Sequence, residues 1–122
     1  MMPNEEPLFP QLVVANLSAE GAASTGAYRN VVVNRVNESC VRLAAFEGDY
    51  RWHFHPHSDE LFVVVEGLLA IDLANGVTLQ LGPWDMVTIP AGTVHRTRAV
   101  PRAVNICFEH LAAETTFVEP TT

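Results

Sequence analysis

Three of the five histidines in this 122-residue chain fall in one short stretch. Residues two apart in a strand point to the same face, so His53 and His55 can reach one ion together. Glu60 follows after a short turn, and its carboxylate can swing back to the same point. His95 comes much later, after Pro90-Ala91-Gly92, where a turn would bring it to the opposite wall. Imidazole and carboxylate groups together suit borderline divalent transition metals and disfavour Ca²⁺ and Mg²⁺.

A rival register is also present, because His55 and His57 form a second H-x-H pair. That pair leaves a shorter gap before the carboxylate, and Pro56 ends the strand between its two histidines, since proline cannot donate to a ladder. We therefore favour His53 with His55 and expect His57 in a solvated loop. His110, at the end of the last expected strand, is predicted to be a surface residue.

The elements that must position these residues are strands. From residue 31 onward, short β-type runs are broken by turn signals about every eight to twelve residues, which is typical of a sandwich or barrel. Asn75-Gly76 predicts a tight hairpin. Helix is expected only as single turns at 18–23, with Ser18 as N-cap, and at 111–114. The expected strands cover residues 31–33, 40–47, 50–55, 61–66, 68–73, 77–81, 86–89 and 103–109.

Two stretches resemble the paired motifs of the cupin family, and the likeness extends over about residues 38–109. It is closest to small one-domain bacterial cupins. The resemblance implies an all-β fold, a double-stranded β-helix or jelly-roll barrel. It also implies that His53, His55, Glu60 and His95 hold one metal ion. The residues that match are Gly48, His53, His55, Glu60 and Gly67 of the first motif, and Pro90, Gly92 and His95 of the second.

The chain departs from the family pattern in three places. The first motif has one residue fewer between its glycine and its first histidine. In the second motif, Trp84 replaces a glycine and Ala99 replaces an asparagine. Losing the asparagine removes a polar group from the pocket, which weakens any analogy to a particular substrate.

The whole chain is expected to form one domain. Residues 1–30 are predicted to be an extended N-terminal arm with a short helical turn, residues 31–110 the barrel, and residues 111–122 a C-terminal tail. A chain of this length can bury a substantial core without disulfide staples.

Composition excludes several classes of function. The net charge is −7 with only seven basic residues, too few to neutralise nucleic-acid phosphates. No apolar run approaches the roughly 20 residues that cross a bilayer, and the acidic N-terminus does not resemble a secretory signal. Cys40 and Cys107 match no redox or zinc motif, so we expect buried thiols in a reducing, cytoplasmic compartment.

Alternation along residues 61–65 predicts the barrel's two faces. If Glu60 points inward, Phe62 and Val64 do so too, while Leu61, Val63 and Val65 face outward. Because both faces are apolar, the outer one needs a cover. We expect a homodimer to supply it; the alternative is the chain's own arm, residues 8–14.

The function expected is that of a metalloenzyme acting on a small oxygenated or carboxylated molecule, of isomerase, dioxygenase or lyase type. The alternative is a non-catalytic module that binds or senses a small molecule, with the metal anchoring it. The metal is expected to be one ion of Mn, Fe, Co, Ni or Zn. The alternation of side chains along the strands does not fix which nearby polar residues line the pocket. The candidates are Arg42, Tyr50, Arg51, Asn105 and Cys107.

Overall fold

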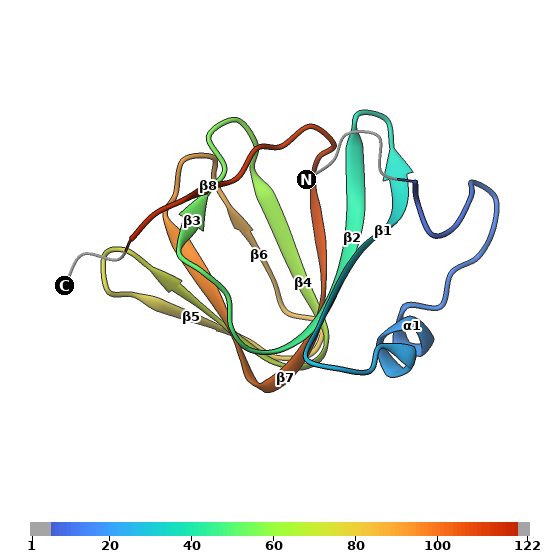
Figure 1. Ribbon diagram of the computed structural model, residues 1–122, viewed down its shortest axis with the longest axis horizontal. Coiled ribbons are helices and arrows are strands. Elements are labelled where there is room, and N and C mark those ends of the chain that lie inside the picture. Colours follow the sequence, from blue (N-terminus) through green and yellow to red (C-terminus); the bar gives the residue numbers. More distant parts are fainter. Residues whose placement is uncertain (1–5, 120–122) are drawn as a thin grey trace.

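The computed structural model describes residues 6–119, so the first five residues of the predicted arm and the last three of the predicted tail lie outside the described part. It is almost entirely β, and its strands curl around a central space (Figure 1). The elements are α1 (Leu17–Ala23), β1 (Tyr28–Val36), β2 (Ser39–Asp49), β3 (His53–Phe54), β4 (Glu60–Leu73), β5 (Thr78–Leu81), β6 (Met86–Ile89), β7 (His95–His110) and β8 (Thr116–Phe117).

Two long strands organise the barrel. β7 pairs antiparallel with β2 and β4, and its first residue also pairs with β3; β4 pairs in addition with β5 and β6. Because β4 and β7 both bend, each of these strands forms part of two opposite walls of the barrel. The early end of β7 therefore faces the early end of β4 across the interior. This is the expected all-β barrel of the double-stranded β-helix type.

The strand predicted to stop at Gly67 does not stop there. β4 continues through Gly67, which has a φ of +82°, and the register against β7 shifts on either side of it. The positive φ bends the strand without ending its hydrogen bonding, since glycine reaches this conformation at little steric cost. The two predicted strands 61–66 and 68–73 are thus one bent strand.

Other element boundaries also differ from the prediction. The strand expected at 50–55 is only His53–Phe54, because β8 pairs with it over two residues and β7 over one. β7 begins at His95 rather than at residue 103, and the expected turn lies just before it, at residues 91–92. The first helix is capped by Asn16, whose Oδ1 accepts from the Ala19 amide, and not by Ser18. Residues 111–114 form a turn and no helix.

The predicted alternation along β4 is confirmed. Phe62 and Val64 are buried in the interior cluster, whereas Leu61 and Val63 are only half-buried. Val65 lies in a second cluster on the outer face, against which Phe9, Ala15 and Leu17 pack. The arm thus covers part of that face, and its Leu8 and Phe9 amides donate to carbonyls of β1.

No helix within residues 6–119 is long and apolar enough to cross a membrane.

Candidate metal centre

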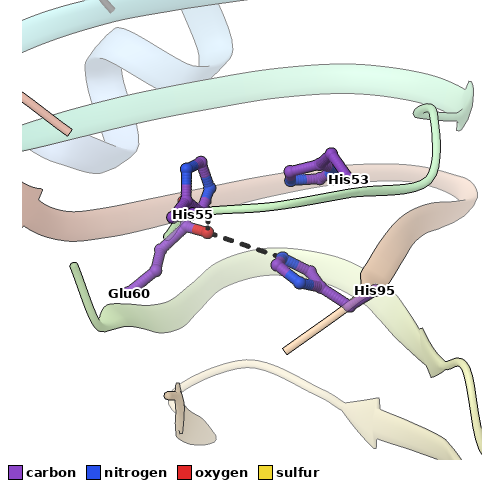
Figure 2. A group of neighbouring side chains, drawn as sticks. All are labelled: His53, His55, Glu60 and His95. Atoms are coloured by element: carbon purple, nitrogen blue, oxygen red, sulfur yellow. Dashed lines mark ion pairs between the residues drawn. The ribbon is translucent and has the colours of Figure 1, made fainter. Parts of the chain in front are cut away.

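Four side chains from three strands and one adjoining loop converge in the barrel (Figure 2). β3 supplies His53, and the residue just after it supplies His55; Glu60 opens β4 and His95 opens β7. One ligand atom from each lies within 4.8 Å of all the others, and all four residues are buried. His53 and His95 are direct ladder partners, with ring centroids 4.4 Å apart. The structure therefore brings together the four residues singled out in the sequence.

The rival histidine lies elsewhere. His57 is exposed in the turn between β3 and β4 and is absent from the cluster. His110 is exposed as predicted, with its Nε2 3.7 Å from Glu38 Oε2.

Backbone carbonyls hold the rings of all three clustered histidines. Nδ1 of His53 lies 2.7 Å from the Arg51 carbonyl oxygen, and Nδ1 of His95 lies 2.8 Å from that of Thr93. Nδ1 of His55 lies 2.9 Å from the carbonyl of Glu114. Because a carbonyl can only accept, each Nδ1 carries the hydrogen. Each Nε2 is then the ring atom available to an ion.

The atoms at the centre of the cluster are better placed to bind a cation than to form hydrogen bonds with one another. Glu60 Oε1 lies 3.1 Å from His55 Nε2 and 3.6 Å from His95 Nε2. Both Glu60 Oε1 and His95 Nε2 are buried without a well-directed hydrogen bond to any residue in 6–119. Ligand atoms about 2.1 Å from a shared ion lie about 3–4 Å apart. A small contraction would therefore bring the four residues onto one divalent ion.

Protonation differs sharply between neighbouring histidines. Burial lowers the pKa of His53 to about 4. Burial alone would also lower the pKa of His55, but the Glu60 carboxylate outweighs it and raises this pKa to about 9. Burial would likewise raise the pKa of Glu60, but the neighbouring rings of His55 and His95 lower it. The metal-free protein at neutral pH thus holds a protonated His55 against an ionised Glu60.

Metal uptake should therefore release about one proton at neutral pH. A metal needs the neutral imidazole, and His55 stays protonated until the pH passes about 9. Apparent affinity should rise up to about tenfold per pH unit below that value and level off above it. Titration calorimetry in buffers of different ionisation enthalpy counts the protons released. Uptake without proton release would contradict this assignment.

A cavity of about 380 Å³ opens at the cluster and reaches along the inner face of β7. His53, His55 and Glu60 line it, so an ion there would face the cavity. Five polar residues were left open as candidates for the pocket lining, and four of them also line this cavity. Arg51 does not; its guanidinium carbon instead lies 4.0 Å from the centroid of the Phe117 ring. Those four are Arg42, Tyr50, Asn105 and Cys107.

A second polar group lies along the same cavity. Arg42 Nε is 3.6 Å from Glu109 Oε1, and its Nη1 donates to Asn30 Oδ1 at 2.7 Å. Asn105 Nδ2 lies 3.1 Å from Cys107 Sγ. Burial, and then the charge of Glu60, raises the pKa of Glu109 to about 7.

Cys107 is a neutral thiol, in keeping with the inert role expected of it. Burial raises its pKa well above the usual value, and the carboxylates of Glu60 and Glu109 add to this. Cys40 is buried as well, and neither cysteine forms a disulfide within residues 6–119.

Comparison with known proteins agrees with this geometry. The family model described as "Cupin domain" matches residues 41–104, more than half of the chain. The chain belongs to the cupin family. It is also 52% identical over 92 residues to the uncharacterized protein YdbB of Bacillus subtilis (strain 168), covering 75% of this chain and 81% of that protein.

Solved structures share the cupin barrel. A cupin-2 domain protein from Shewanella frigidimarina NCIMB 400 is 27% identical, with a TM-score of 0.74 over 80% of this chain and 94% of that one. The DMSP lyase DddQ from Ruegeria pomeroyi DSS-3 is 17% identical, with a TM-score of 0.67 over 79% of this chain and 54% of that one. At that identity the second likeness shows the fold alone.

The two substitutions in the second cupin motif lie away from the cluster. Trp84 has a φ of +68° and is exposed, so this turn requires the left-handed conformation that glycine adopts easily, and tryptophan adopts it here. Ala99 is buried in the apolar interior cluster and does not line the cavity. Neither substitution alters the four residues.

Sequence reasoning missed two contributors to this cupin's site. The Glu114 carbonyl comes from the predicted tail, and no local pattern pairs it with His55. Glu109 had a signal, because Asn105, Cys107 and Glu109 alternate along one strand face. Extending the parity argument to β7 would have found it.

Removing the tail should weaken metal binding in this cupin. The tail pairs through β8 with β3, Val118 donates to the Trp52 carbonyl, and Glu114 orients His55. Loss of such an orienting partner typically costs about 10–100-fold in metal affinity. A chain ending at Ala113 should show that loss in a competition titration with a chromogenic chelator. A chain ending at Glu119 is the control; equal affinity in both would show that the tail does not orient His55.

Proposed function

We propose that this cupin is a metal-dependent enzyme acting on a small oxygenated or carboxylated molecule. In this proposal, His53, His55, Glu60 and His95 hold one divalent ion of Mn, Fe, Co, Ni or Zn. The single observation that carries the proposal is that three of the four open onto a cavity large enough for a small molecule. A purely structural ion would instead be enclosed by its ligands.

The chemistry of the site supports this assignment. When bound, a divalent ion supplies Lewis-acid or redox chemistry. Phe46 and Phe62 line the cavity and limit water around a substrate. Burial raises the pKa of the Tyr50 phenol, which therefore stays protonated and can donate to a substrate oxygen. Isomerisation, oxygenation and lyase chemistry all use such groups, and a lyase is known on this fold.

The test is turnover that requires the metal. Protein stripped with chelator and reloaded with each of the five metals is incubated with hydroxy acids, oxo acids and diketones, and products are followed by NMR. Product formation with wild type but not with His53→Ala supports an enzyme. Ligand-induced thermal shifts with no product for any pairing would favour a module that binds a small molecule without reacting.

We also propose that the protein forms a homodimer in the cytoplasm. The arm leaves the side chains of Leu12 and Val14 exposed, and Met86 of β6 is 63% exposed. Exposed apolar side chains such as these can be buried when two chains associate. Light scattering at micromolar concentration should give twice the mass of one chain; the mass of a single chain would count against the dimer.

A further inference from the structure

The interior face of β7 carries two polar atoms that the protein leaves unused. Asn105 Oδ1 and Glu109 Oε2 are both buried, and neither accepts a hydrogen bond from any residue in 6–119. Asn105 is 2% exposed and Glu109 7% exposed. Both residues line the cavity. Buried acceptors without donors are costly, and native proteins rarely keep them without a purpose.

The cation beside them is already engaged. Arg42 faces the Glu109 carboxylate through Nε and holds Asn30 through Nη1. Its charge offsets that of Glu109, so this wall does not offer a lone positive group to a ligand carboxylate. What remains on offer are acceptors, Asn105 Oδ1 always and Glu109 Oε2 in its ionised form, which favour donors and repel a second anionic group.

The two acceptors lie at different distances from the four clustered residues. Glu109 is the ladder partner of Glu60, whereas Asn105 pairs with Val64, four residues further along the strand. At about 3.3 Å per residue, they mark out a path of about 13 Å between Cα atoms. A ligand touching both must extend along β7 away from the cluster.

We infer that Asn105 and Glu109 determine specificity for a ligand that bears hydroxyl groups along its length. Such a molecule binds through oxygen atoms at the centre formed by the four clustered residues. Its further hydroxyl groups donate hydrogen bonds to Asn105 Oδ1 and Glu109 Oε2. The class is a hydroxylated small molecule, with any carboxylate at the metal end only. The inference rests on the proposed function, because it assigns the substrate class of that same site.

A matched pair of probes tests this directly. Gluconate and α-hydroxyhexanoate share the same carbon chain length and the same α-hydroxy acid head, but only gluconate carries further hydroxyls. Metal-loaded protein should bind gluconate about 100-fold more tightly by calorimetry, about tenfold for each of the two hydrogen bonds. Equal affinity for the two, or no binding of either at millimolar concentration, would overturn the inference.

Two variants then locate the preference. Asn105→Leu removes one acceptor, and Glu109→Gln replaces the other with a donor while keeping an oxygen for Arg42. Each should reduce the gluconate preference by about tenfold while metal content stays at one equivalent. If one variant does not fold, the other carries the test. Thr97→Val, another polar residue of the cavity wall whose hydroxyl is not among the unpartnered atoms, should keep the preference.

Measuring the metal content distinguishes failure of this inference from failure of the proposed function. Protein that takes up metal and binds both probes equally would leave the metal centre standing and reject the assignment of Asn105 and Glu109. Protein that takes up no metal would reject the proposed function itself. A preference unchanged in both variants would also reject the assignment.

Discussion

Replacing Glu60 with glutamine should reduce the metal content of the purified protein from about one equivalent to a trace. Glutamine keeps the shape of the side chain but loses the charge that balances a divalent cation among neutral imidazoles. Glu60 Oε1 lies within 3.6 Å of two of the three clustered histidines, and among residues 6–119 no other carboxylate belongs to the cluster. We expect an affinity loss of at least about 100-fold, since even losing an orienting partner costs about 10–100-fold. Elemental analysis and a chelator competition titration measure it.

The matched control for Glu60→Gln is His57→Ala. His57 lies close in sequence but is exposed and outside the cluster, so its loss should leave metal content at one equivalent. A Glu60→Gln protein that retains full metal content would show that the ion, if bound, lies elsewhere. Loss of metal in His57→Ala would instead favour the alternative in which His55 and His57 form the metal-binding pair.

Gly67→Ala should be among the most destabilising single methyl additions in the chain. Gly67 has a φ of +82°, and an added Cβ would overlap the Arg102 carbonyl oxygen, which is backbone and cannot rotate away. The φ alone costs about 1–2 kcal/mol for alanine. With the steric overlap, we expect the free energy of unfolding to fall by more than about 3 kcal/mol. Urea unfolding followed by tryptophan fluorescence provides the measurement.

Gly76→Ala separates the two causes. Gly76 has a φ of +92° in the predicted hairpin turn, but nothing lies within 4 Å of an added Cβ. Its substitution should cost only the conformational part, about 1–2 kcal/mol. Equal losses at both glycines would mean that the approach of Arg102 to the β4 bend has no energetic weight.

The bend at Gly67 also links stability to the site. It turns β4 so that Glu60, at its start, faces His95 at the start of β7. A Gly67→Ala protein that still folds should therefore bind metal more weakly as well.

Local sequence determined which residues could make the site. The spacing of two places His53 and His55 on one face wherever the chain is extended, and Pro56 decides against His57. The alternation from Glu60 to Val64 fixes which side chains face inward, because a strand has a strict period of two. These are short-range properties, and the structure agrees with them.

Tertiary structure decided what local periodicity cannot encode. Gly67 carries the same turn signal whether a strand ends or bends there, and only the continuing ladder with β7 makes it a bend. The pairing of His53 with His95, and the Glu114 carbonyl that orients His55, join residues about forty and sixty positions apart. Arg42 meets Glu109 in the same way. Such contacts depend on how the bent strands close into a barrel, so local sequence determined which residues could form the His/Glu cluster, and the closed barrel determined the cavity and the orientation of the three histidine rings.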